Sequence, residues 1–190
     1  FGETVFFYIL VLAAASLLTM RSLAEERHAG TIETLLTAPI TEAQVVVAKY
    51  LSAIALYAVL WAPTLLYPLI LSRYSEIDLG PLASGYLGTL GIGAMFLAVG
   101  LFFSALTRSQ ITSALLSLGV NFALFLLPIF VFVSASVGDD SPLEYMNLWT
   151  HMEDFGRGIV DSRPLVYYGS VTLFALFATV QVLQARRWGR

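Results

Sequence analysis

Five long apolar segments divide the chain, and polar stretches separate them. The apolar segments cover residues 4–20, 45–71, 82–106, 111–133 and 165–183. Each is close to or above the roughly 17–25 residues that a helix needs to cross the hydrocarbon core of a bilayer. Their apolar residues are continuous rather than alternating, so they predict helices and not the strands of a barrel. The pattern therefore predicts an all-α fold, a polytopic transmembrane helical bundle that forms one domain over residues 1–190.

The beginning of the chain suggests that one span is missing. The first residue is Phe1 rather than Met, and five spans place the two ends on opposite sides of the membrane. We therefore expect six spans in the full-length protein, with the first of them absent from this sequence. A cleaved signal peptide is the competing explanation.

The composition agrees with a membrane protein and excludes several other classes. Of the 190 residues, 58% are apolar and 12% are charged, and the mean hydropathy is +0.80. Soluble domains carry about a quarter of charged residues, so an ordinary soluble enzyme or a disordered chain is excluded. The absence of cysteine excludes disulfides and thiolate chemistry. A net charge of −3 gives no general attraction for nucleic acid.

Basic residues indicate which connections face the cytoplasm. Seven of the ten Lys and Arg residues lie in connection 21–44 and the adjoining Lys49, in connection 107–110, or in the tail 184–190. The other three lie in the connections on the opposite side. The positive-inside rule therefore places the first group of connections, with the C-terminus, in the cytoplasm.

The cytoplasmic connection 21–44 contains a short amphipathic helix. It begins with charged residues and passes Gly30, after which Ile32, Leu35 and Leu36 share one helical face. A loop that only joined two spans would not need such a helix. We therefore expect this connection to have a functional role beyond joining two spans.

Clear signals end that short helix and begin the next one. Pro39 ends it, and Thr41 and Gln44 have the spacing of a capping box at the start of the next span. Ile40 and Val45 are placed as a hydrophobic staple around the same start. The pattern predicts a sharp break immediately before the second span.

Several blocks of this sequence resemble one known family. The most specific block is Glu25–Arg27 with Gly30–Thr41, and the supporting blocks are Lys49, Gly100–Gln110, Asp154–Asp161 and Arg186–Trp188. Together they resemble the ABC-2-type transporter permeases, and most closely the branch that contains the gliding-motility-associated permeases. The resemblance covers nearly the whole chain.

The resemblance implies that transport and ATP binding belong to different subunits. The permease has no ATP site and binds no cofactor, and a separate ABC ATPase subunit binds ATP and Mg. The sequence agrees, since it contains no Gly-x-x-x-x-Gly-Lys-Ser/Thr loop. The resemblance also implies a second permease copy or a paralogue, contact with membrane lipid in the bacterial inner membrane, and export.

The resemblance further implies a coupling helix whose apolar face lies in a groove of the ATPase. The expected contacts are Glu25, Glu26, Arg27, Gly30, Thr31, Ile32, Glu33, Leu35 and Leu36, with Arg108 in the second connection. Thr107 and Gln110 also have capping-box spacing, which predicts a Thr107 cap on the following span. On the pattern alone, an amphipathic segment that merely lies on the membrane is the alternative.

Small and polar residues within the spans predict helix packing. Gly85, Gly88 and Gly91 repeat every three residues and form a narrow stripe at which helices can approach closely. A dimer surface or a translocation path is the alternative role of that stripe. Asn121 is expected to form a hydrogen bond between helices rather than to contact a substrate.

The extracytoplasmic connection 134–164 is the longest, and its apolar spacing predicts one or two short interfacial helices. They could gate the pathway or seal the bundle. His151, Glu153 and Asp154 lack the His-Glu-x-x-His spacing of a zinc site. With Arg157, the two acids are better interpreted as a surface charge cluster. We therefore assign no catalytic, cofactor-binding or metal-binding residue.

These patterns favour one function over two others. The first is the permease subunit of an ABC transporter, which couples ATP hydrolysis by its partner to substrate translocation. The second is a membrane scaffold that transports nothing and is driven by an ATPase in extracytoplasmic assembly or motility. An intramembrane enzyme is disfavoured, because the spans contain no paired catalytic groups.

Overall fold

A computed structural model describes residues 5–28, 41–74, 78–134 and 146–188. Within these ranges all regular elements are helices and there is no strand. The predicted all-α fold is therefore confirmed as a polytopic helical bundle. In chain order the elements are α1 (Val5–Thr19), α2 (Ala24–His28), α4 (Glu42–Trp61), the 3₁₀ turn η1 (Ala62–Leu65), α5 (Leu66–Leu71), α6 (Leu79–Leu106), α7 (Gln110–Ser134), α8 (Leu148–Gly156) and α9 (Ser162–Trp188).

Most of these helices have the length and apolarity of membrane spans. Four stretches of the described chain meet both conditions, and they are Val5–Glu26, Glu42–Leu71, Leu79–Leu106 and Ser162–Ala185. Helix α7 has 25 residues, which at 1.5 Å per residue gives a length of about 38 Å. Within the described residues, the five predicted apolar segments lie almost entirely in helices.

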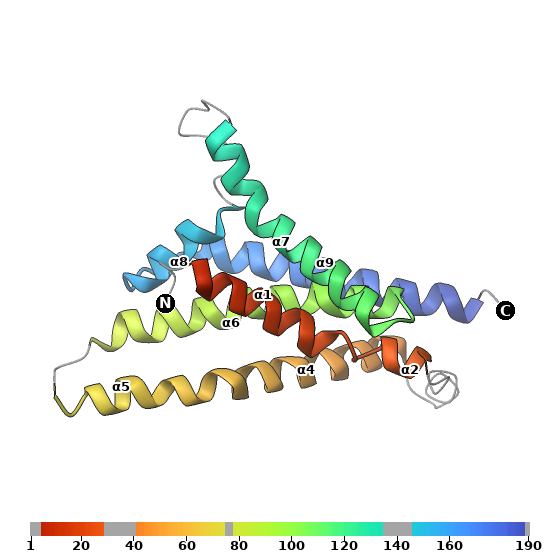
Figure 1. The fold of residues 1–190 in the computed structure, drawn as a ribbon, viewed down its shortest axis with the longest axis horizontal. Helices are drawn as coiled ribbons and strands as arrows, with labels where there is room; N and C mark the ends of the chain where they lie inside the picture. The colour runs from red at the N-terminus through yellow and green to blue at the C-terminus, as the bar shows by residue number, and fades with distance from the viewer. Residues whose placement is uncertain (1–4, 29–40, 75–77, 135–145, 189–190) are drawn as a thin grey trace.

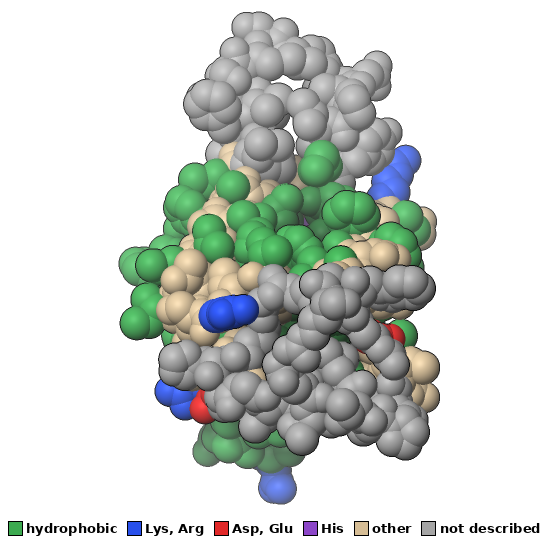
Figure 2. Space-filling view, turned by 90° about the vertical axis from the view of Figure 1, so that its right-hand side faces the viewer, with side chains coloured by type: hydrophobic (Ala, Val, Ile, Leu, Met, Phe, Trp, Pro, Cys, Tyr) green, Lys and Arg blue, Asp and Glu red, His purple; other side chains and the backbone are tan. Residues whose placement is uncertain are grey.

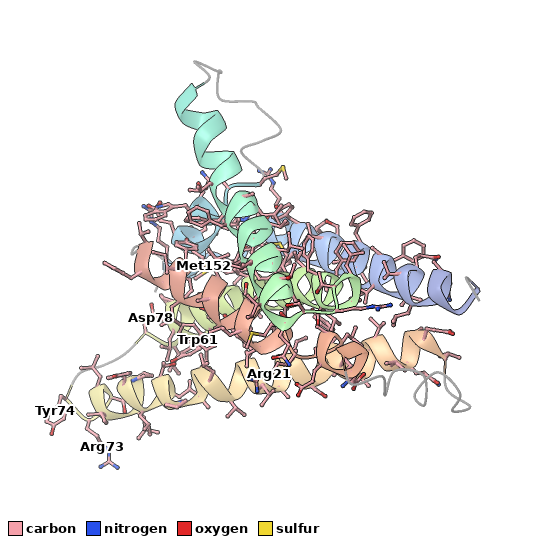
Figure 3. All side chains as sticks on the ribbon, turned by 45° about the vertical axis from the view of Figure 1, so that its right-hand side comes forward. Arg21, Trp61, Arg73, Tyr74, Asp78 and Met152 are labelled. Atoms are coloured by element: carbon pink, nitrogen blue, oxygen red, sulfur yellow. The ribbon has the colours of Figure 1, made fainter. Side chains whose placement is uncertain are left out.

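The spanning helices alternate in direction, so the connections gather at two ends (Figure 1). One end carries α2, the start of α4, the α6–α7 connection and the end of α9. We call residues 20–28, which contain α2, the elbow, and this end of the bundle the elbow end. Figure 3 places Arg21 of the elbow where α1 ends beside α4, whereas Arg73 and Tyr74 lie at the opposite end beyond α5. The alternation brings together the connections that the sequence assigned to one side of the membrane.

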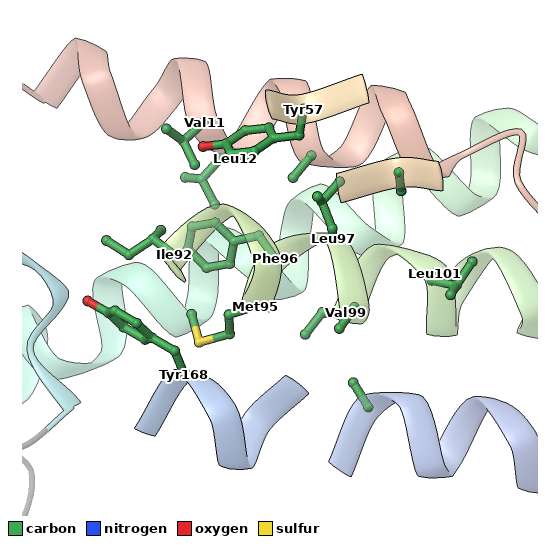
Figure 4. Close-up of a cluster of buried hydrophobic side chains, with 14 of the residues drawn as sticks. Val11, Leu12, Tyr57, Ile92, Met95, Phe96, Leu97, Val99, Leu101 and Tyr168 are labelled. Carbon is green, nitrogen blue, oxygen red and sulfur yellow. The ribbon is translucent and has the colours of Figure 1, made fainter. Parts of the chain in front are cut away.

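Helix α6 is the centre of the bundle, because it packs against α1, α4, α7, α8 and α9. Its sequence is apolar on all sides, which is typical of a helix surrounded by protein. In Figure 4, Ile92 and Phe96 of α6 lie among Leu12 of α1, Tyr57 of α4 and Tyr168 of α9. The outer helices instead expose many large apolar side chains, as expected of surfaces that face lipid.

Two glycines let neighbouring helices approach α6 closely. A Cβ atom on Gly93 would lie 2.1 Å from a ring carbon of Tyr57 in α4. One on Gly100 would lie 2.1 Å from the hydroxyl of Thr19 in α1. Both distances are far below van der Waals contact, so these interfaces require a residue without a side chain.

Helices α6 and α9 start earlier than the apolar pattern predicts. Helix α6 begins at Leu79 rather than at residue 82, because Asp78 caps it by accepting the backbone N–H of Gly80 at 2.9 Å. Pro81 then lies in the first turn, where its missing N–H removes no helical hydrogen bond. Helix α9 likewise begins before its proline, at Ser162 rather than at residue 165.

The predicted Thr107 cap on α7 is wrong. The backbone N–H of Thr107 donates to the carbonyl of Phe103 at 3.1 Å, and its hydroxyl donates to the same carbonyl at 3.0 Å. Thr107 therefore closes the last turn of α6. The hydroxyl of Ser109, two residues later, accepts the N–H of Thr112 at 3.5 Å at the start of α7. Capping-box spacing occurs at Thr107, but the preceding helix already uses that residue.

Candidate functional site

The elbow rests directly on the end of α6 through Ser104. The Ser104 Oγ atom accepts the backbone N–H of Leu23 at 3.0 Å and that of Ala24 at 3.1 Å. The same hydroxyl donates to the carbonyl of Met20 at 3.3 Å. Ser104, Leu23 and Ala24 are all completely buried. Because a buried backbone N–H needs a partner, this one hydroxyl fixes the turn from α1 into α2 against α6.

An ion pair joins the elbow to α4. The Nζ atom of Lys49 contacts the carboxylate of Glu26, and the two side chains are only 31% and 25% exposed. Partial burial limits the screening that weakens fully exposed pairs. Glu26 lies in α2 and Lys49 lies in the third turn of α4. The pair therefore connects the two elements that flank residues 29–40.

The predicted capping box at the start of α4 is confirmed. The Thr41 hydroxyl accepts the N–H of Gln44 at 3.3 Å, and the Gln44 side chain accepts the N–H of Thr41 at 3.0 Å. Glu42 lies in the first turn, where a negative charge suits the helix dipole. The staple partner Ile40 lies outside the described residues. The capping box gives α4 a fixed start close to the elbow.

Exposed charges surround this anchored region. Arg21 and Glu25 of the elbow are exposed, and so is Arg108 in the α6–α7 connection. In the view onto the elbow end, the described Lys and Arg side chains are scattered over the face and its margin, among hydrophobic side chains (Figure 2). The elbow end thus combines a buried anchor with charged groups that a partner could contact.

The predicted ATPase contacts are only partly within the described structure. Glu25, Glu26 and Arg108 are described, and all three lie at the elbow end. Arg27 lies in α2, but its side chain is not among those described. The others, Gly30, Thr31, Ile32, Glu33, Leu35 and Leu36, lie outside the described residues. The coupling helix itself stays a prediction.

Two of the three glycines in the predicted packing stripe, Gly88 and Gly91, face different neighbours. Gly85 is buried, and a Cβ on Gly88 would lie 2.6 Å from the ring of Phe155 in α8. A Cβ on Gly91 would lie 3.0 Å from the ring of Tyr168 in α9. With 3.6 residues per turn, a spacing of three rotates each glycine about 60° from the previous one. The stripe therefore winds across α6 and meets α8 and α9 in succession.

Asn121 joins α7 to α6. Its Nδ2 atom donates to the carbonyl of Phe96 at 3.3 Å, and the side chain is completely buried. Ser113 and Ser117, at four-residue spacing before it, are completely buried as well. The polar face of α7 therefore points into the bundle rather than toward lipid.

At the opposite end, α8 packs on the bundle. The Ser84 hydroxyl of α6 donates to the carbonyl of Phe155 at 2.6 Å. His151 is buried, with a ring nitrogen 3.3 Å from the Tyr168 hydroxyl. Glu153 instead forms an exposed ion pair with Arg157. Among the described residues no group of His, Cys, Asp and Glu could hold a metal ion.

The sequence interpretation missed the roles of Ser104 and Lys49. Both were present in the blocks that carry the family resemblance, but neither received a structural role. Lys49 is the one charged residue inside the five apolar segments, so it needs a partner or an exit to water. That signal could have identified it, whereas nothing local distinguishes Ser104 from other hydroxyl residues in spans.

Comparison with known protein families gives one match. Residues 2–183 match the family described as ABC-2 family transporter protein. The match includes the elbow, Ser104 and all of the spanning helices up to Leu183 of α9. It does not single out the gliding-motility-associated branch. A search of curated proteins found no match. The helical bundle, its apolar spans and the extent of the match agree, and the chain therefore belongs to the ABC-2 family of transporter proteins.

Proposed function

We propose that this chain is the permease subunit of an ABC transporter and couples ATP hydrolysis by a separate ATPase subunit to export of a substrate. ATP and Mg bind to the partner ATPase. A second copy of the chain, or a paralogue, completes the membrane part of the transporter. Family membership supports the permease role and association with an ABC ATPase.

The anchoring of the elbow is the observation that carries this proposal. Ser104 binds the elbow to α6, and Lys49 binds it to α4. A displacement of the connection that follows the elbow would therefore reach two spans directly. Because α6 packs against α1, α4, α7, α8 and α9 as well as α2, its movement would change the packing of the whole bundle. Such a connection between elbow and spans suits a permease that is driven by ATP hydrolysis on another subunit.

We place the elbow end in the cytoplasm of a bacterial cell, with the C-terminus on the same side. The connections that meet at this end, together with Lys49, carry seven of the ten Lys and Arg residues. A cytoplasmic excess of basic residues is the main determinant of orientation for short loops. This orientation presents the elbow to a cytoplasmic ATPase.

Docking on the ATPase can be tested by co-purification. The variant with Ile32→Glu, Leu35→Glu and Leu36→Glu removes the apolar face of the predicted coupling helix. We expect it to reach the membrane but to lose the ATPase during purification, because a charged face cannot be buried in an apolar groove. Retention of the ATPase by this variant would contradict docking through residues 31–36.

A matched control is available at the other end of the bundle. Ile159 and Val160 are exposed in the connection between α8 and α9, and Ile159→Glu with Val160→Glu should leave the ATPase bound. Reconstitution with the ATPase then separates transport from a scaffold role. ATPase stimulation with movement of cargo supports the permease, whereas stimulation without movement of any tested cargo favours the scaffold.

A further inference from the structure

An apolar groove runs between α6, α7 and α9. Its volume is about 530 Å³, which is within the range of pockets that hold small ligands. Its walls include Val99 and Phe103 of α6, Val120 and Leu124 of α7, and Val171 and Ala178 of α9. Because α6 and α9 have the length and apolarity of membrane spans, the groove lies at the depth of the hydrocarbon.

The lining offers an occupant almost only carbon. Ser170 is the one hydroxyl residue among the side chains that line the groove, and its hydroxyl donates to the carbonyl of Tyr167 at 2.9 Å. Phe174 at the rim is 73% exposed, so the groove opens sideways toward lipid. A polar solute would lose its hydrogen bonds in such a site. A flexible hydrocarbon chain would lose none.

The groove also has a direction within the membrane. On α6 it includes Val99 and Phe103, which lie in the last two turns, and on α7 it reaches only to Leu124. On α7 and α9 the lining residues, at 120–124 and 170–178, lie near the middle of each helix, so the groove lies at mid-membrane and approaches the elbow end along α6. Arg108 lies in the α6–α7 connection at that end and is exposed. It follows Phe103 by five residues and lies two residues beyond Leu106, the last residue of α6.

We propose that this groove binds one acyl chain of an anionic phospholipid whose phosphate contacts Arg108. The hydrocarbon depth of the groove accounts for the chain, and the arginine at its end accounts for the headgroup. The site can be tested for bound lipid on the chain alone, without an ATPase. It places a lipid against α6, the helix that also holds the elbow.

Native mass spectrometry of the protein released from nanodiscs tests the acyl-chain contact. The full chain should retain one phospholipid per copy. Ala178→Trp fills the groove, and we expect retention to fall about tenfold, because the chain loses its packing surface. The control Leu173→Trp adds the same side chain to an exposed position of α9 that does not line the groove. Equal retention by both variants and the unmodified protein would overturn the proposal.

Lipid preference tests the headgroup contact. In nanodiscs with equal phosphatidylglycerol and phosphatidylcholine, we expect about a fivefold preference for the anionic lipid, which is the effect of one basic residue near a membrane surface. Arg108→Gln should abolish that preference. Arg73→Gln, at the opposite end of the bundle, should preserve it. A preference that survives Arg108→Gln would refute the phosphate contact.

A photo-crosslinking amino acid at Val171 keeps the test valid if the tryptophan variant fails to fold. This side chain lies in the groove wall and is only partly buried. Irradiation in native membranes should give an adduct with the mass of a phospholipid. A crosslinked protein dimer or a crosslink to another protein would show that a helix, not a lipid, fills the groove, and would reject the proposal.

Discussion

The Ser104 hydroxyl accepts the backbone N–H of Leu23 at 3.0 Å, although 81 positions separate the two residues in the chain. This contact decides the path of the chain after α1. Without it, the buried N–H groups of Leu23 and Ala24 would need another partner at a place surrounded by apolar side chains. The elbow is therefore a part of the bundle rather than a loop that hangs from it.

Removal of the Ser104 hydroxyl should loosen the elbow. We expect Ser104→Ala to cost about 1–3 kcal/mol, because two buried backbone donors lose their acceptor. Thermal unfolding of the purified protein in detergent measures this loss. Ser52→Ala is the matched control, since the Ser52 hydroxyl is exposed and bonds only within α4. The anchoring role is wrong if both variants unfold at the same temperature.

Reversal of the Glu26–Lys49 pair should reveal its contribution. Lys49→Glu places two carboxylates together, and we expect weaker stimulation of the partner ATPase by the reconstituted transporter. The double variant Glu26→Lys with Lys49→Glu should recover most of the activity. A double-mutant cycle on unfolding should give a coupling energy of about 1 kcal/mol for this partly buried pair.

The exposed Glu153–Arg157 pair at the opposite end provides the comparison for that cycle. Its coupling energy should be about 0.3–0.5 kcal/mol, as for exposed pairs one helical turn apart. If the swapped Glu26–Lys49 variant has normal stability but does not recover stimulation of the ATPase, the contribution of this pair depends on which residue carries which charge. Pairing of opposite charges would then not be sufficient.

The glycines of α6 and α7 should differ sharply in their tolerance of alanine. A Cβ on Gly93 would lie 2.1 Å from the buried ring of Tyr57, whereas a Cβ on Gly119 meets nothing within 4 Å. We expect Gly93→Ala to destabilise the protein by about 1–3 kcal/mol through overpacking. Gly119→Ala should be neutral or stabilise by up to about 1 kcal/mol. Equal unfolding temperatures for the two variants would contradict the close contact between α4 and α6.

Membrane orientation can be measured with single cysteines, because the chain contains none. Arg108→Cys lies at the elbow end, and Tyr74→Cys lies in an exposed position at the opposite end. In intact cells, a reagent that cannot cross the inner membrane should label Tyr74→Cys and spare Arg108→Cys. Inverted vesicles should give the opposite result. Labelling in the reverse pattern would place the elbow outside the cytoplasm and remove the basis of the proposed coupling.

Local sequence patterns gave the helices and most of their ends. The apolar segments identified where helices lie, and the Thr41–Gln44 capping box was predicted and is present. The starts of α6 and α9 were set too late, and a further error occurred where α6 and α7 meet. Thr107 has the spacing of a cap for α7, but it closes α6, because the spacing does not say which of two adjacent helices uses the hydroxyl.

The sequence predicted a site in the connection after the first span, and the contacts around the elbow required the structure. Glu26 and Lys49 were both noted in the sequence, yet their pairing depends on how α2 folds back toward α4. The glycine stripe of α6 was also evident, but the identity of its neighbours, Phe155 and Tyr168, was not. A pattern along one helix gives the shape of a face and leaves open what covers it.

The sequence alone determined that this protein is a bundle of membrane helices. A backbone in lipid must satisfy its own hydrogen bonds, and a continuous apolar segment does so by forming a helix. The sequence also determined the family and, through its basic residues, a predicted orientation. Only the tertiary structure decided that α6 is central and that Ser104 holds the elbow. Spans are almost equally apolar on every side, so hydrophobicity cannot select their neighbours. Close packing at glycines and a few buried hydrogen bonds make that selection, and these depend on residues distant in the chain.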